Sequence, residues 1–159
     1  MDEDLDFLNE APLGATEHAE ILSAEAVRAG IEPVRTELVD WAAKALHVRC
    51  PAAAAYRGAK GLVQCRLDVD RHLKHLLNRP VDGDREAMVA YRKWALVAIW
   101  SPRGSSADSL DVGLIVLAES LVRYAPWPMG PRAARQLLLA LAHPNPQVES
   151  NVAQRIGCG

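Results

Sequence analysis

The side chains best suited to metal or thiol chemistry lie between residues 47 and 75. They are His47, Cys50, Cys65, Asp68, His72 and His75. Zinc sites in proteins combine cysteine thiolates, imidazoles and carboxylates, four to a metal. The spacing here matches no standard zinc finger, and no Cys-x-x-Cys occurs. We therefore expect no metal site, and the residues that would form one are His47, Cys50, Asp68, His72 and His75.

Cys65, Asp68 and His72 have spacings of three and four residues, which place side chains on one stripe of a helix. Cys65 and His72 are two turns apart, about 10 Å along the axis, so they cannot share a metal by themselves. A cysteine nucleophile needs a base, a group that orients the base and an oxyanion site, and no pattern supplies them. The stripe predicts a polar helix edge beside the core. We expect no catalytic residues, no cofactor and no enzymatic activity.

Two short patterns resemble nucleic-acid-binding motifs and have simpler structural explanations. Residues 58–61 read Gly-Ala-Lys-Gly, the form of the loop that clamps a nucleic-acid backbone in KH modules. No strands are predicted around it, so close packing of helices explains the small residues better. Residues 132–156 resemble the first two helices of a helix-turn-helix unit, but no recognition helix follows them. A helical hairpin that covers the core is the favoured interpretation.

Basic residues are dense in the middle of the chain. Nine of them form a candidate surface for nucleic acid or for an acidic partner: Arg57, Lys60, Arg66, Arg71, Lys74, Arg79, Arg92, Lys93 and Arg103. Such a surface could follow a phosphate backbone. The alternative is an ordinary solvated face whose charges pair with nearby carboxylates. The isoelectric point of about 6.2 for the whole chain argues against strong nonspecific binding to nucleic acid.

The N-terminus is an acidic arm, which we place at residues 1–14. Its candidate docking residues are Asp2, Glu3, Asp4, Leu5, Asp6, Phe7 and Leu8. The first basic residue is Arg28; residues 1–50 carry a charge of −7 and residues 51–159 carry +5. An arm of this kind is either a solvating tail or a docking segment that joins its apolar side chains to a groove and its carboxylates to a basic surface.

The fold predicted to position these groups is all-α. Half of the residues are hydrophobic, mostly Ala, Leu and Val, with one Phe and two Thr, a composition that favours packed helices over sheets. Periodicity predicts about seven helices. Their expected ranges are 16–29, 33–50, 62–78, 85–100, 110–124, 132–142 and 147–156. Thr16 is the expected first cap and Gly30 the expected stop of the first helix.

The expected organisation is a compact bundle in residues 15–125 and a C-terminal hairpin in residues 132–159 packed on it. The prolines within residues 125–131 mark the boundary between them. The helix at 110–124 is the most apolar and should be the centre of the core. Its apolar run, Val112–Ala118, is too short for a membrane span, which needs about 20 residues.

Three cysteines and no leader-like start predict a reducing, cytoplasmic compartment. The abundance of Arg, Ala, Gly and Pro is typical of a GC-rich bacterial, phage or viral coding sequence. We expect neither a membrane nor a small-molecule substrate as a partner.

The function that these features favour is contact with proteins, either as a homo-oligomer or as a regulator of a partner protein. Opposite charges on the arm and on the rest of the chain are the reason, because they can join subunits or dock another chain. Trp41, Trp94, Trp100 and Trp127 are candidate anchors wherever they are exposed. The alternative is a nucleic-acid-binding regulator or packaging protein that uses the basic surface between residues 57 and 103.

Overall fold

The computed structural model describes residues 22–50, 58–79 and 85–141, and all regular secondary structure in these ranges is helical, as the sequence predicts. The elements are α2 (Ala24–Ile31), the 3-10 turn η2 (Glu32–Val34), α3 (Arg35–Arg49), α4 (Gly58–Leu77), α5 (Arg85–Ala95), the π turn η4 (Leu96–Trp100), α6 (Ala107–Tyr124) and α7 (Met129–Leu141). The described ranges hold fewer helices than the seven expected. The acidic arm and the expected helix at 147–156 lie outside them.

Helix α6 is the centre of the fold. Every residue from Ser109 to Leu121 is buried, so this helix is covered on all sides. A helix that is apolar all round can be stable only in such an interior position. It begins after Ser106, whose hydroxyl accepts a hydrogen bond from the amide of Ser109 at 3.2 Å. The expected central helix is therefore confirmed, with a start a few residues earlier.

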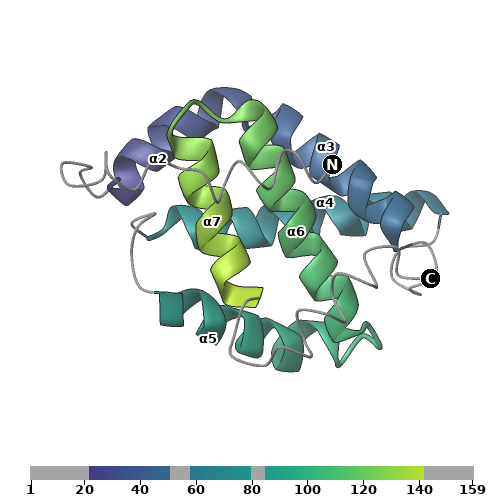
Figure 1. Ribbon diagram of the computed structural model, residues 1–159. Helices are drawn as coiled ribbons and strands as arrows, with labels where there is room; N and C mark the ends of the chain where they lie inside the picture. The colour runs from purple at the N-terminus through teal and green to yellow at the C-terminus, as the bar shows by residue number, and fades with distance from the viewer. Residues whose placement is uncertain (1–21, 51–57, 80–84, 142–159) are drawn as a thin grey trace.

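The other helices surround α6. Figure 1 shows α6 and α7 side by side, with α4 crossing behind them and α5 across one end of the molecule. Helix α6 packs against α3, α4 and α7, while α5 packs against α7. The turn between α6 and α7 is short, which makes the two helices antiparallel neighbours. One hydrophobic core therefore joins all the described helices, from Val27 in α2 to Leu141 in α7.

The π turn η4 determines which residues after α5 are buried. A regular helix would place Ala98 and Ile99 beneath the buried Ala95. In a π turn the hydrogen bonds run over five residues, as in the bond from the amide of Ser101 to the carbonyl of Leu96 at 2.8 Å. The residue beneath Ala95 is therefore Trp100, which is fully buried, and Val97 and Ala98 are exposed.

Three helix ends differ from their predicted positions. Helix α2 continues through Gly30, which was expected to stop it; a Cβ there would meet the Sδ of Met129 at 2.6 Å, so this glycine allows close packing. Helix α4 begins at Gly58, four residues early, so residues 58–61 form its first turn and no loop. Helix α7 begins before Pro131, since a proline in the first turn loses no helical hydrogen bond.

Within the described residues, no helix combines the length and the apolar character that crossing a bilayer would require.

Gly130 provides a test of the contact between α6 and α7. A Cβ at this position would lie 2.4 Å from the carbonyl oxygen of Leu121 and 3.3 Å from the Cβ of Ala125. We expect Gly130→Ala to lower the free energy of unfolding by about 1–3 kcal/mol, because backbone atoms must move to relieve the overlap. On an open helix surface the same change would stabilise by about 1 kcal/mol, so the sign of the effect is diagnostic.

Urea unfolding measures this effect, with Arg135→Ala on the exposed face of α7 as the control that should stay within about 0.5 kcal/mol of the wild type. A Gly130→Ala protein as stable as the wild type, or more stable, would contradict the close α6–α7 contact.

Candidate functional site

One group of buried polar side chains lies on a single stripe of α4. Cys65, Asp68 and His72 share this stripe, as their spacing predicts, and all three are fully buried. They therefore lie inside the core, where a polar edge beside the core was expected. Burial raises the pKa of Cys65 to about 12, so its thiol stays protonated and is a poor nucleophile at neutral pH.

Asp68 is held by side chains from two parts of the chain. Arg103 donates from Nη1 to Oδ1 at 3.0 Å and from Nη2 to Oδ2 at 2.5 Å. Gln64 donates to the same Oδ1 at 3.0 Å, and Arg71 lies at 3.5 Å from it. A buried carboxylate is stable only when it is paired and hydrogen-bonded in this way. The ion pair between Arg103 and Asp68 therefore connects the loop after η4 to the middle of α4.

His72 lies next to this ion pair and stacks on Trp100. The two ring centroids are 5.2 Å apart, and the guanidinium of Arg103 covers the Trp100 ring at 4.5 Å. The Nδ1 of His72 is 2.6 Å from the hydroxyl of Tyr91, and no described residue forms a hydrogen bond with its Nε2. Burial, together with the positive charges of Arg71 and Arg103, lowers the pKa of His72 to about 3. This imidazole is neutral at physiological pH.

The ring contacts continue from His72 to the surface. Tyr91 stacks on His75 with centroids 4.0 Å apart, and its ring lies 6.1 Å from that of Trp94. Arg79 donates from Nε to the Nε2 of His75 at 3.2 Å. Burial and the charge of Arg79 lower the pKa of His75. Trp94 is 55% exposed, so this series of rings ends in solvent on the outer side of α5.

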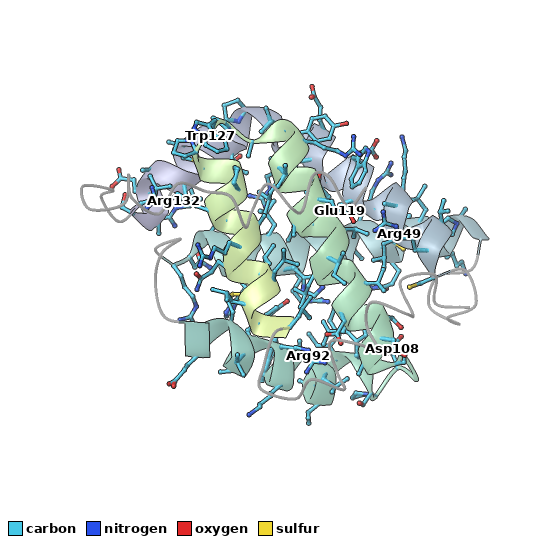
Figure 2. All side chains as sticks on the ribbon, viewed as in Figure 1. Arg49, Arg92, Asp108, Glu119, Trp127 and Arg132 are labelled. Carbon is cyan, nitrogen blue, oxygen red and sulfur yellow. The ribbon has the colours of Figure 1, made fainter. Side chains whose placement is uncertain are left out.

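Two further buried ion pairs join the central helix to its neighbours. Glu119 of α6 accepts from Arg49 of α3 at 3.1 and 2.8 Å, and Figure 2 shows the two side chains between these helices. Asp111 of α6 accepts from Arg92 of α5 at 2.6 and 2.8 Å. Burial of Asp111 raises its pKa in spite of Arg92. Each pair is bidentate, which is the strongest geometry for an arginine and a carboxylate.

The candidate metal ligands do not form one site in the described part of the chain. Among residues 22–50, 58–79 and 85–141, no three His, Cys, Asp or Glu side chains form a group that could hold a metal ion. Asp68 is committed to Arg103, and His72 faces Tyr91 and Trp100. Cys50 is disulfide-bonded, so its sulfur is not a free thiolate. Disulfides are typical of oxidising compartments, so the predicted reducing compartment is not confirmed.

The structure divides the nine basic candidates into three groups. Arg92 and Arg103 are part-buried in the ion pairs with Asp111 and Asp68, which sequence spacing could not reveal. Arg66 faces α3, where it pairs with Asp40 beside an open groove of about 490 Å³ between α3 and α4. Arg57 lies outside the described residues. The remaining five are exposed or part-exposed on α4, just after it, or on α5: Lys60, Arg71, Lys74, Arg79 and Lys93.

We use the name α4–α5 face for the exposed stripe of α4 together with the exposed residues of α5 and η4. On α4, residues 60, 63, 67, 71 and 74 follow helical spacing along one stripe that points away from the core. Val63 and Leu67 on this stripe are 56% and 54% exposed. On α5 and η4, Trp94 is accompanied by Val97, which is 72% exposed, and by Lys93. Contact between His75 and Tyr91 joins the two helices beside these residues.

The four tryptophans differ in what they can contact. Trp100 is fully buried, and Trp41 is part-buried beneath the guanidinium of Arg123 at 4.7 Å. Trp94 and Trp127 are exposed, and Figure 2 shows Trp127 at the turn between α6 and α7, at the end opposite α5. Only Trp94 is therefore part of the α4–α5 face. The docking residues of the acidic arm, from Asp2 to Leu8, lie outside the described residues.

Comparison with protein-family models, curated proteins and solved structures finds no match for this chain.

The neutral, buried His72 makes stability depend on pH. In the unfolded chain its pKa is about 6.5, and in the fold it is about 3. The unfolded state therefore binds more protons as the pH falls below 6.5, and stability decreases until the pH approaches 3. We expect the contribution of His72 to lower the free energy of unfolding by about 2 kcal/mol between pH 7 and pH 5.

Urea unfolding of the wild type and of His72→Gln at both pH values measures this contribution. The variant should be less stable at pH 7, because it loses ring stacking, but should lose about 2 kcal/mol less than the wild type on acidification. Equal losses in both proteins would show that His72 is not held neutral by burial.

Proposed function

We propose that this chain is a protein-interaction module, which assembles with itself or binds and regulates a partner protein, and that the α4–α5 face is its contact surface. The observation that carries the proposal is the exposure of Val63, Leu67, Trp94 and Val97 on neighbouring helices. Single exposed apolar residues are common, whereas exposed apolar side chains that are neighbours on a helix mark a candidate binding surface. Val63 and Leu67 form such a pair on α4, and Trp94 and Val97 form one on α5 and η4.

The burial of these side chains could drive binding. Covering a Val, Leu or Trp side chain that is half exposed in the free chain gains on the order of 1 kcal/mol or more. Trp94 is the natural anchor, because tryptophans in the centre of an interface contribute a large part of the binding energy. Its ring already rests against Tyr91 at a centroid distance of 6.1 Å, which limits the entropy lost when a partner covers it.

The charge of the face favours an acidic partner. Five bases surround the apolar side chains: Lys60, Arg71, Lys74, Arg79 and Lys93. Lys74 pairs with Asp70, and Glu86 lies in the first turn of α5, so the face is positive without being uniformly basic. Nucleic acid is the less favoured ligand, because Arg66, Arg92 and Arg103 are engaged with carboxylates and do not add to the charge of this surface.

Val97→Ser tests the proposal, with Val48→Ser as the matched control. Val48 on α3 is 74% exposed, close to the value for Val97, and it lies off the α4–α5 face. We expect Val97→Ser and Trp94→Ser to reduce the recovery of the bound protein, or the homo-oligomer fraction, by about tenfold, as is usual for anchors of an interface. Val48→Ser should leave both unchanged.

The measurement is affinity purification of the tagged full chain from its own cells with quantitative mass spectrometry, together with native mass measurement of the assembly. Circular dichroism checks that each variant is folded. Recovery that is the same for Val97→Ser, Trp94→Ser and wild type contradicts the proposal. Loss of all bound material on nuclease treatment would favour the nucleic-acid alternative in its place.

A further inference from the structure

We infer that the first residues of the acidic arm, Asp2 to Leu8, bind the α4–α5 face of their own chain and cover it until a partner protein displaces them. This inference rests on the proposed function for its regulatory meaning. Its physical basis is independent of any partner and consists of three features: the composition of the arm, the composition of the face and the length of chain between them.

The arm and the face are complementary in charge and in apolar content. Asp2, Glu3, Asp4 and Asp6 supply four carboxylates in a stretch of seven residues, and no base occurs before Arg28. The face carries Arg71, Lys74, Arg79 and Lys93. Arg71 also pairs with Asp68 and Lys74 with Asp70, and both side chains remain partly exposed. Opposite charges of this kind guide and orient a docking segment.

The apolar side chains of the arm match those of the face. Leu5, Phe7 and Leu8 are the three large apolar residues within this acidic stretch. Val63 and Leu67 on one helix, and Trp94 and Val97 on the next, are exposed and available to them. An aromatic ring such as that of Phe7 stacks favourably on a tryptophan, with a gain beyond that of burial alone. A peptide that contains both acidic and apolar residues fits this surface in both respects.

The chain is long enough for the arm to reach its own face. The described structure begins at Leu22, which leaves residues 9–21 as the connection between the docking residues and α2. Fully extended, a segment of this length spans up to about 45 Å, and with residues 16–21 helical, as the sequence predicts, it spans about 33 Å. Both lengths are comparable to the diameter expected of a domain of this size. Binding to the same chain therefore requires no change in the described helices.

The same chain is favoured over a second copy by effective concentration. A short flexible connection holds the arm at a concentration on the order of millimolar near its own face. A second copy at micromolar concentration competes poorly with this unless geometry prevents the intrachain contact. A partner protein with a stronger anchor for Trp94 can still displace the arm, so the arm sets a threshold for partner binding.

Photocrosslinking in the full chain tests the inference. Phe7 is replaced by the photoreactive analogue p-benzoylphenylalanine, the purified protein is irradiated, and the products are mapped by mass spectrometry. We expect a cross-link within one chain, at monomer mass, to residues of α4 or of the segment Arg85–Trp100. Val97→Ser should reduce its yield about fivefold or more, and Val48→Ser should not. Salt at about 0.5 M should also reduce it, because the charges are exposed.

Cross-links at dimer mass, cross-links to other helices, or no cross-link would overturn the inference. Its failure is separable from failure of the proposed function. If no intrachain cross-link forms but partner recovery still depends on Val97, the arm has no masking role and the contact surface stands. If the cross-link forms but partner recovery is independent of Val97, the face binds only the arm. As a further readout, Phe7→Ser should raise partner recovery several-fold, and unchanged or lower recovery would contradict masking.

Discussion

The fold depends on a buried central helix that carries charged side chains into the core. Helix α6 is enclosed on every side, yet it carries Asp111 and Glu119, whose carboxylates would be prohibitively expensive to bury alone. Arg92 from α5 and Arg49 from α3 neutralise them with paired hydrogen bonds. Because bidentate pairs require a defined geometry, they fix the rotation of α6 relative to both neighbours more tightly than apolar packing does. Specificity of this kind is the best-attested use of buried polar groups.

The same principle extends outward from α6. Asp68 on α4 is paired with Arg103, whose guanidinium also covers Trp100, and Trp100 stacks on His72. The π turn η4 makes this arrangement possible, since it brings Trp100 to the inner side of the helix. The opposite side of the same segment then presents Val97 and Ala98 to solvent. One local change in helical geometry therefore contributes both to the polar interior and to the apolar surface that we assign to a partner.

Sequence reasoning succeeds where a single helix determines the outcome. Periodicity identifies α6 as the centre and places Cys65, Asp68 and His72 on one stripe, because both depend only on the helical repeat. Sequence reasoning fails where contacts between helices determine the role of a residue. From the sequence, Arg92 and Arg103 are interpreted as surface bases. The structure shows that they pair with Asp111 and Asp68. Gly30 has the form of a helix stop, but its lack of a side chain serves contact with Met129. The π turn has no sequence signature, so the exposure of Val97 could not be predicted.

The central claim is that buried ion pairs between α6 and its neighbours fix the fold and thereby the position of the α4–α5 face. A double-mutant cycle with Arg92→Met, Asp111→Leu and both together tests it most directly by urea unfolding. We predict that Arg92→Met costs about 3–5 kcal/mol, because it leaves the buried Asp111 carboxylate unpaired. Asp111→Leu should cost less, because the Arg92 side chain is only part-buried, and the double variant should recover most of the loss. If the two single effects are small and simply additive, the pair does not organise the bundle and the account is contradicted.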